Sequence, residues 1–204
     1  MRKANIAVLV SGGGTNLQAI IDAQKNGIIS SGAISLVVAN NENAYALERA
    51  KNYGIDSVII TKKAAGSQEN FETELISTLE AHKIDLIVLA GFMSILSERF
   101  TSHFADKIIN VHPSLIPSFC GKGFYGLKVH EAALEYGVKV TGATVHFVNE
   151  IPDGGKIILQ KAVCIEDGDT PEVLQKRVME QAEWIILPQA VEKISKELIM
   201  SEEN

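Results

Sequence analysis

The sequence predicts a Rossmann-like α/β fold, an open and mostly parallel twisted sheet with helices on both faces and an antiparallel addition in the C-terminal half. Up to Gly91, short apolar runs rich in β-branched residues alternate with longer amphipathic segments. This alternation is typical of buried parallel strands joined by helical crossovers. After Gly91 the spacing changes, and a later run alternates apolar and polar residues, as half-exposed strands do.

The first half is expected to contain four strands and three helices in alternating order. The expected strands are Ile6–Val10, Ile34–Ala39, Ser57–Ile60 and Leu86–Ala90. The expected helices are Leu17–Lys25, Ala44–Tyr53 and Asn70–His82. Strands that alternate with helices in this way pair in parallel through right-handed crossovers.

The second half begins with a fifth expected strand, which runs directly into Pro113. A loop rich in Gly, Pro and Ser follows it and extends to Gly126. The later expected elements are strands Ile108–His112, Ala143–Val148 and Ile157–Ile165, helix Lys128–Tyr136, and a last helix reaching about Lys196. Thr170 and Pro171 are suited to the N-cap and first position of that last helix. Because repeats and linker-like segments are absent from the sequence, we expect a single domain, 1–204, with halves 1–91 and 92–204.

The composition is that of a soluble globular protein. Of 204 residues, 46% are hydrophobic and 22% are charged, and the formal net charge is −6. An acidic balance disfavours a general nucleic-acid or anionic-membrane binder. The two cysteines, Cys120 and Cys164, are too few for a disulfide framework, and we interpret Cys164 as a core strand residue. The apolar runs are too short for a membrane span or a signal peptide, so we expect a cytoplasmic protein.

A glycine-rich segment, Ser11 to Asn16 (SGGGTN), separates the first expected strand from the first helix. Glycines let the backbone approach an anion closely, and a helix N-terminus offers free N–H groups and a positive dipole end. The segment is neither a Walker loop nor a good dinucleotide fingerprint, because Leu17 stands where a third glycine belongs. We interpret it as a phosphate site, with a simple tight turn as the alternative.

Asn110 and His112 project from the same face of the fifth expected strand, at its carboxyl end. Open α/β sheets bind ligands at this edge. The alternative for His112 is a half-buried structural histidine. Asp153 lies in a Pro-Asp-Gly-Gly turn, where Asp is common for conformational reasons alone. If it meets His112, its charge would raise the pKa of the imidazole and favour the charged form.

The remaining candidates are weaker. His146 is interpreted as a sheet-surface histidine or a support for the site. His82, His103 and His130 are interpreted as solvated. The spacings typical of metal sites and the GxSxG motif of a serine nucleophile are absent, so we expect neither a metal nor a Ser114 nucleophile.

Four segments together resemble one family across essentially the whole chain. They are SGGGTNLQAII, LAGFMSIL, NVHPSLIP, and GATVHFV with its following DGG. The chain resembles the glycinamide ribonucleotide transformylases, formyltransferases of purine synthesis. This resemblance implies direct transfer of a formyl group from 10-formyltetrahydrofolate, as co-substrate, to the amino group of glycinamide ribonucleotide, without a metal.

By this resemblance, the first half is a nucleotide-phosphate-binding half and the second a folate-binding and catalytic half. The implied catalytic residues are Asn110, His112 and Asp153. Implied nucleotide contacts are Gly12, Gly13, Gly14, Thr15, Asn16 and Glu183. Implied folate contacts are Gln68, Phe92, Met93, Ser94, Ile95, Leu96 and Asn110, with Val148–Asp153 closing over the pterin. The implied partners are small molecules, with no nucleic acid and no membrane, and the chain is expected to be a monomer or a homodimer.

The sequence departs from the family pattern in three places. The loop Cys120–Leu127 carries extra residues, GKGFYG. Gln68 stands near a basic folate-side position, so Lys62 or Lys63 is expected to bind the folate tail instead. The spacing from Arg177 to Glu183 is longer by one residue, and Trp184 stands where relatives often have His.

Three other functions remain as alternatives. A formyltetrahydrofolate hydrolase and a methionyl-tRNA formyltransferase share the folate chemistry, but we expect neither, because their usual extra domains have no room in this chain. A non-catalytic nucleotide-binding module has no need for an oxyanion-stabilising pair such as Asn110 and His112.

Overall fold

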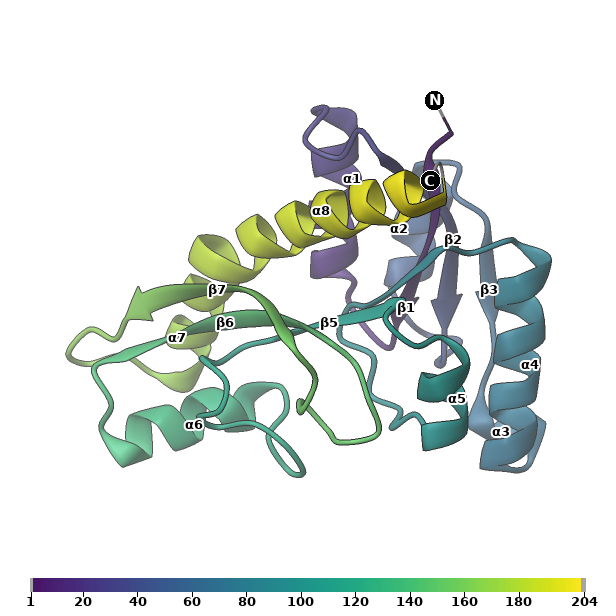
Figure 1. Ribbon diagram of the computed structural model, residues 1–204. Coiled ribbons are helices and arrows are strands. Elements are labelled where there is room, and N and C mark those ends of the chain that lie inside the picture. The colour runs from purple at the N-terminus through teal and green to yellow at the C-terminus, as the bar shows by residue number, and fades with distance from the viewer. Residues whose placement is uncertain (1, 203–204) are drawn as a thin grey trace.

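The computed structural model describes residues 2–202, which form a seven-stranded sheet in the order β3-β2-β1-β4-β5-β6-β7 (Figure 1). The strands are β1 (Ala4–Val10), β2 (Gly32–Ala39), β3 (Ser57–Ile59), β4 (Leu86–Leu89), β5 (Ile108–His112), β6 (Val140–Phe147) and β7 (Ile157–Cys164). The helices are α1 (Thr15–Lys25), α2 (Ala46–Asn52), α3 (Lys62–Ala65), α4 (Gln68–Ala81), α5 (Glu98–His103), α6 (Leu127–Tyr136), α7 (Pro171–Val178), the π-helical turn η1 (Met179–Glu183) and α8 (Trp184–Glu202).

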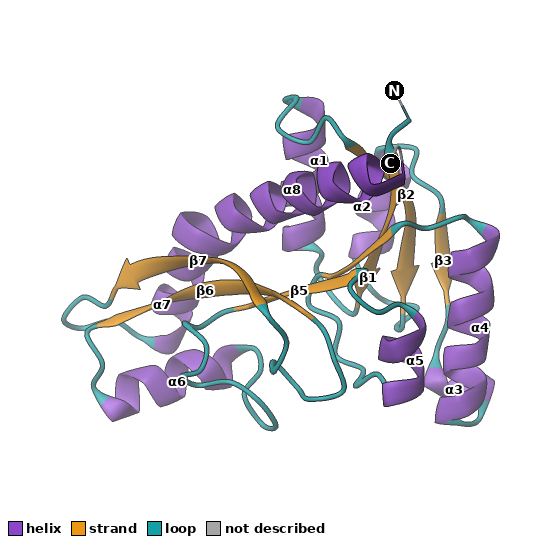
Figure 2. Ribbon diagram, in the orientation of Figure 1, coloured by secondary structure: helices purple, strands orange, loops and turns teal. Residues whose placement is uncertain are grey.

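The sheet has a parallel part and an antiparallel part. Strands β1 to β5 pair in parallel, whereas β6 pairs antiparallel with β5 and β7 pairs antiparallel with β6. The two parts form a single sheet that runs across the whole molecule (Figure 2). The predicted fold class is therefore confirmed.

Two hydrophobic cores cover the two faces of the parallel part. Residues of β1 alternate between them: Ile6, Val8 and Val10 pack on the side of α1 and α8, and Ala7 and Leu9 pack on the side of α4 and α5. Both sets are fully buried. Because successive strand residues point to opposite faces, a strand covered on both faces is apolar at every position. This is why the apolar runs of the first half are continuous.

Several element boundaries differ from the predicted ones. The sequence did not predict α3 and α5, which have four and six residues and are too short to show an amphipathic period. The side chains of Thr61 and Ser97 cap these short helices. The last helix reaches Glu202 rather than about Lys196, and η1 interrupts its regular α-helical hydrogen bonding.

The prediction that Cys164 is a core residue was wrong. Cys164 lies on β7, as expected, but its side chain is exposed. Strand β7 is at the edge of the sheet, and near its end Val163 is buried whereas the next residue, Cys164, points to the opposite face and is exposed. Within residues 2–202, no helix is both long and apolar enough to cross a membrane.

Candidate active site

The glycine-rich segment connects β1 to α1, as predicted. Gly14 adopts a left-handed conformation (φ 70°) at the N-cap and has no side chain to occupy the first-turn N–H groups of α1. Helix α2 holds the segment from the side: the Ala46 N–H donates to the Gly12 carbonyl (3.1 Å), and Arg49 Nε donates to the Gly13 carbonyl (2.8 Å). The geometry is that of an anion site at a helix N-terminus.

Asn16 and Glu183 meet although 167 residues separate them, and both side chains are buried. Asn16 Nδ2 donates to Glu183 Oε2 over 2.8 Å. Burial raises the pKa of Glu183 to about 6, and the hydrogen bond from Asn16 only partly opposes this shift. Glu183 ends the π-helical turn η1, which accommodates about one more residue per turn than an α-helix does.

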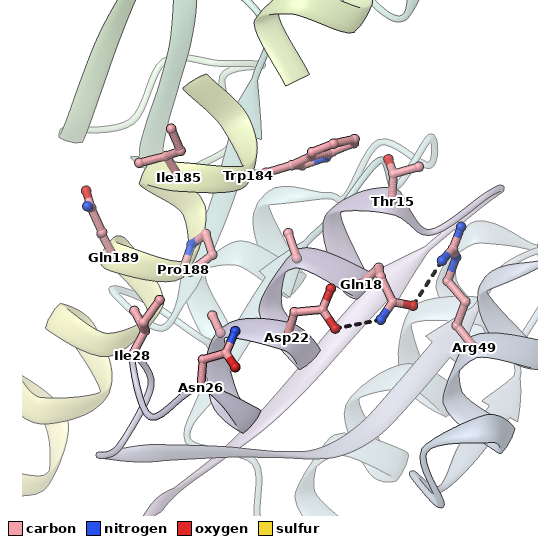
Figure 3. A pocket seen from close by; sticks show the side chains of 12 residues that line it. Thr15, Gln18, Asp22, Asn26, Ile28, Arg49, Trp184, Ile185, Pro188 and Gln189 are labelled. Atoms are coloured by element: carbon pink, nitrogen blue, oxygen red, sulfur yellow. Dashed lines mark hydrogen bonds between the residues drawn. The ribbon is translucent and has the colours of Figure 1, made fainter. Parts of the chain in front are cut away.

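A cavity of about 460 Å³ opens beside Thr15, between α1 and the start of α8 (Figure 3). Its lining residues are Thr15, Gln18, Ala19, Asp22, Ala23, Asn26, Ile28, Arg49, Trp184, Ile185, Pro188 and Gln189. Gln18 lies between Arg49 and Asp22 and is bonded to both, at 2.9 Å each. The sequence did not predict this cavity, because its wall residues come from α1 and the loop after it, from α2 and from α8, which meet only in the fold.

The three predicted catalytic residues lie at the carboxyl end of β5 and in the turn after β6. His112 is 4% exposed, and its Nδ1 lies 3.5 Å from Asp153 Oδ2. His146 contacts both Asn110 and Asp153: its Nε2 is 3.2 Å from Asn110 Nδ2 and 3.6 Å from Asp153 Oδ1. The contact between His112 and Asp153 is therefore present. The buried His146 supports the site by contacting Asn110 and Asp153.

The second ring nitrogen of His112 is also engaged. Nε2 lies 2.9 Å from the carbonyl oxygen of Phe119, in the loop after β5. Because a carbonyl oxygen only accepts, Nε2 carries a proton, and Nδ1 is the atom that faces Asp153. Phe119 could not be found from sequence, because its contribution comes from a backbone group.

Burial dominates the protonation of His112. Burial lowers the pKa of the imidazole, and the Asp153 charge and the Phe119 carbonyl only partly oppose it. The expectation of a raised pKa was thus wrong in its net direction, although Asp153 acts in the expected sense. Burial alone would raise the pKa of Asp153, but His146, His112 and the Gly121 N–H outweigh it and hold that pKa below its usual value. Asp153 is therefore ionised at neutral pH.

A smaller cavity of about 130 Å³ adjoins Asn110 and Asp153. Its lining residues are Leu89, Phe92, Ser94, Ile95, Leu96, Asn110, His146 and 148–153. Two of the residues expected to bind folate do not line it. The Met93 side chain is 55% exposed, and its N–H donates to Ser11 Oγ. Gln68 donates to Glu72 Oε1 and to the Ile95 carbonyl instead.

The prediction that His130 is solvated was also wrong. His130 is 0% exposed on α6, and within residues 2–202 neither of its ring nitrogens has a hydrogen-bond partner. Burial, followed by the nearby charge of His112, lowers the pKa of His130 to about 4. His82 is half-buried and its Nδ1 contacts the Thr78 carbonyl, whereas His103 is exposed.

Two further observations concern a serine nucleophile and a metal ion. Ser114 is buried, and its Oγ donates to the Ser118 carbonyl, so the structure gives it no position as a nucleophile. The described part of the chain holds no group of three or more His, Cys, Asp or Glu side chains that could bind a metal ion.

The fold is that of an α/β enzyme, and the candidate site lies at the carboxyl edge of the parallel strands, where enzymes of this class bind their ligands. Residues 4–191 match the family described as formyl transferase. The chain belongs to the formyl transferase family.

Named relatives agree with this assignment. Phosphoribosylglycinamide formyltransferase of Escherichia coli is 44% identical over 177 residues, 87% of this chain and 81% of the relative. The human trifunctional purine biosynthetic protein adenosine-3 is 42% identical over 203 residues. That alignment covers 100% of this chain but 19% of the human protein, so the chain spans about a fifth of that relative's length.

A solved structure of a named relative has the same fold. Glycinamide ribonucleotide transformylase 1 from Symbiobacterium toebii superposes with a TM-score of 0.89 at 40% identity, covering 96% of this chain and 89% of that one.

Proposed function

We propose that this chain transfers the formyl group of 10-formyltetrahydrofolate to the amino group of 5′-phosphoribosylglycinamide, in purine synthesis. The observation that carries the proposal is the pair formed by buried His112 and half-buried Asp153, with Nδ1 and Oδ2 3.5 Å apart beside Asn110 at the carboxyl end of β5. Relatives with this named activity support the choice of substrates.

The nucleotide is proposed to bind through Gly12 to Asn16, with its phosphate on the first-turn N–H groups of α1. Glu183, held by Asn16, is proposed to accept hydrogen bonds from the ribose hydroxyls. In the charged form a carboxylate offers several acceptor sites to hydroxyl donors. The folate is proposed to bind in the cavity beside Asn110, between 92–96 and 148–153. Lys62, Lys63 and Gln68 remain candidates for contacts with its tail.

In the proposed reaction the substrate amine attacks the formyl carbon and one C–N bond forms as the bond to the folate nitrogen breaks. Negative charge develops on the formyl oxygen, where the Asn110 amide and His112 Nδ1–H donate. Nδ1 is the remaining ring nitrogen, because Nε2 donates to Phe119, and it carries a proton in the charged form of the imidazole. Ionised Asp153 favours protonated His112 and, through a water molecule, helps the amine proton reach the folate nitrogen.

The proposal includes a soluble enzyme of the cytoplasm that acts on small molecules as a monomer or a homodimer. The net charge of −6 supports small-molecule substrates over a tRNA. The chemistry needs no metal ion, because the developing charge has two hydrogen-bond donors.

The test is a formyl-transfer assay on the purified chain. A 10-formyltetrahydrofolate analogue with an optical deformylation signal is mixed with the protein, with and without glycinamide ribonucleotide. We expect deformylation only when the nucleotide is present. Deformylation without the nucleotide would instead assign a formyltetrahydrofolate hydrolase, and none from folded protein in either mixture would reject both.

A further inference from the structure

The loop between β5 and α6 contacts both members of the His112–Asp153 pair through its backbone. The Phe119 carbonyl accepts from His112 Nε2 over 2.9 Å. Two residues later, the Gly121 N–H donates to Asp153 Oδ2 over 2.8 Å. The orientation of the imidazole and the direction of the carboxylate thus depend on a few backbone atoms of one loop.

Phe119 presents its carbonyl from an unfavourable backbone conformation. Its φ is 49°, in the left-handed region that non-glycine residues rarely occupy. Such a conformation is unfavourable for a residue with a side chain and persists only where surrounding contacts determine it. The Phe119 side chain supplies such contacts: its ring lies edge-on to Phe124 (centroids 6.3 Å apart) and to Tyr136 (5.9 Å). Edge-to-face pairs of this kind are stabilising beyond their buried area.

We propose that Phe124 is a positioning residue for the reaction, because its ring, together with Tyr136, holds the Phe119 carbonyl against His112 Nε2 and so keeps Nδ1 as the atom presented to Asp153 and the substrate. Phe124 lies in the GKGFYG segment and touches neither catalytic side chain. The expected effect on the reaction rate rests on the proposed function, whereas the expected position of the proton on the His112 ring does not depend on it.

Loss of the Phe124 ring has a definite consequence for His112. Without the carbonyl acceptor, the neutral imidazole can carry its proton on Nδ1, where Asp153 accepts it, and Nε2 is left unprotonated. The Phe119 carbonyl is also one of the contacts that oppose the lowering of the His112 pKa, so that pKa falls further. The other ionisable groups near the pair are His146 and His130, which interact with His112, and Cys120, which interacts with Asp153.

The test compares Phe124→Leu with Tyr125→Leu as a matched control. Tyr125 is the next residue of the same segment, 47% exposed, and it contacts Lys128 rather than Phe119. Nitrogen-15 NMR of the histidine side chains reports which ring nitrogen of His112 is protonated, across a pH titration. A His112→Gln sample assigns the signals, and thermal unfolding confirms that each variant is folded.

For wild type and Tyr125→Leu we expect a protonated Nε2 throughout the titration. For Phe124→Leu we expect Nδ1–H to be populated in the neutral ring and the His112 pKa to fall. In the transfer assay, kcat should fall about tenfold or more, since small misplacements of catalytic groups are costly, and KM for both substrates should stay within about twofold. The alkaline limb of the kcat profile should move to lower pH, and Phe124→Tyr should restore wild-type behaviour.

A Phe124→Leu protein whose His112 signals match those of wild type would overturn the proposal, whatever its activity. If Phe124→Leu does not fold, Tyr136→Leu replaces it. That position is 80% exposed, so truncation there leaves the core intact, and the same change of His112 is expected to a smaller extent. If the wild-type chain transfers no formyl group, the proposed function fails, while the NMR comparison still decides the positioning role of Phe124.

Discussion

The two ends of the candidate site are built in different ways. At the nucleotide end, the groups offered to the ligand are mostly backbone N–H groups of Gly12 to Asn16, and packing against α2 sets their direction. At the catalytic end, the groups are side chains, and neighbouring charges and one loop carbonyl set their protonation. We therefore expect the shape of the backbone to matter most in the Gly12–Asn16 segment, and the protonation of single atoms to matter most at the catalytic end.

The largest expected effect is at the catalytic end. His112→Ala removes one of two donors to the developing oxyanion, so kcat should fall by a factor on the order of 100 to 1000. Binding of the nucleotide should survive, because its contacts lie at the other end. The assay and a calorimetric titration measure the two quantities separately. His103→Ala, at an exposed histidine paired with Glu80, is the control, and a loss of only a few-fold in His112→Ala would remove His112 from the mechanism.

At the nucleotide end, shape should matter most at Gly14. A Cβ there would lie 2.7 Å from the Ala46 Cβ and 2.9 Å from its Cα, at a φ of 70°. Gly14→Ala should therefore separate the loop from α2, raise KM for the nucleotide about tenfold or more, and lower stability by about 1–3 kcal/mol, with kcat changed less.

Gly13→Ala is the matched comparison for stability, because a Cβ at Gly13 meets nothing within 4 Å. Thermal unfolding of the two variants should show a loss for Gly14→Ala alone. Equal unfolding temperatures would mean that packing against α2 does not hold the loop.

The smallest expected effect is on the stability of the protein and concerns Glu183, the buried carboxyl group at the nucleotide end. Its pKa in the folded protein is about 6, above the ordinary value of 4.5, so its contribution to stability is greatest below pH 4.5 and is lost as pH rises through about 6. At pH 8 the buried charge should cost about 2 kcal/mol. Glu183→Gln should therefore be more stable than wild type by up to that amount at pH 8 and equal to it near pH 4.5.

Urea unfolding at the two pH values measures this difference. We also expect Glu183→Gln to bind the nucleotide more weakly, because an amide offers a single acceptor oxygen to the ribose hydroxyls. The same stability difference at both pH values would show that Glu183 is not buried as a charge.

The fold was largely predictable because its strands are covered on both faces and are therefore apolar at every position. The pairing of Asn110 and His112 on one face was predictable for a similar reason, since the period of a strand is two residues. Their contact with Asp153 could only be stated as a condition, because spacing along the chain does not show which loops meet in space.

The parts that could not be predicted depend on backbone groups or on the environment of a whole element. The Phe119 carbonyl and the bond from Arg49 to the Gly13 carbonyl have no sequence signal, because every residue has a carbonyl. His130 was misplaced because a histidine on an amphipathic helix can face either side. The net pKa of His112 was misjudged because sequence shows a neighbouring charge but not the degree of burial that opposes it.

The π-helical turn Met179–Glu183 has a consequence for the phase of the last helix. A residue added to an ordinary α-helix rotates everything after it by about 100° about the axis, which would turn a buried stripe toward water. In this protein the wider π-helical turn accommodates an additional residue within the turn itself. Leu174 and Val178 before the turn, and Leu187 and Val191 after it, all reach the same hydrophobic core. The π-helical turn thus keeps the helical segments on its two sides in the same angular register on the sheet.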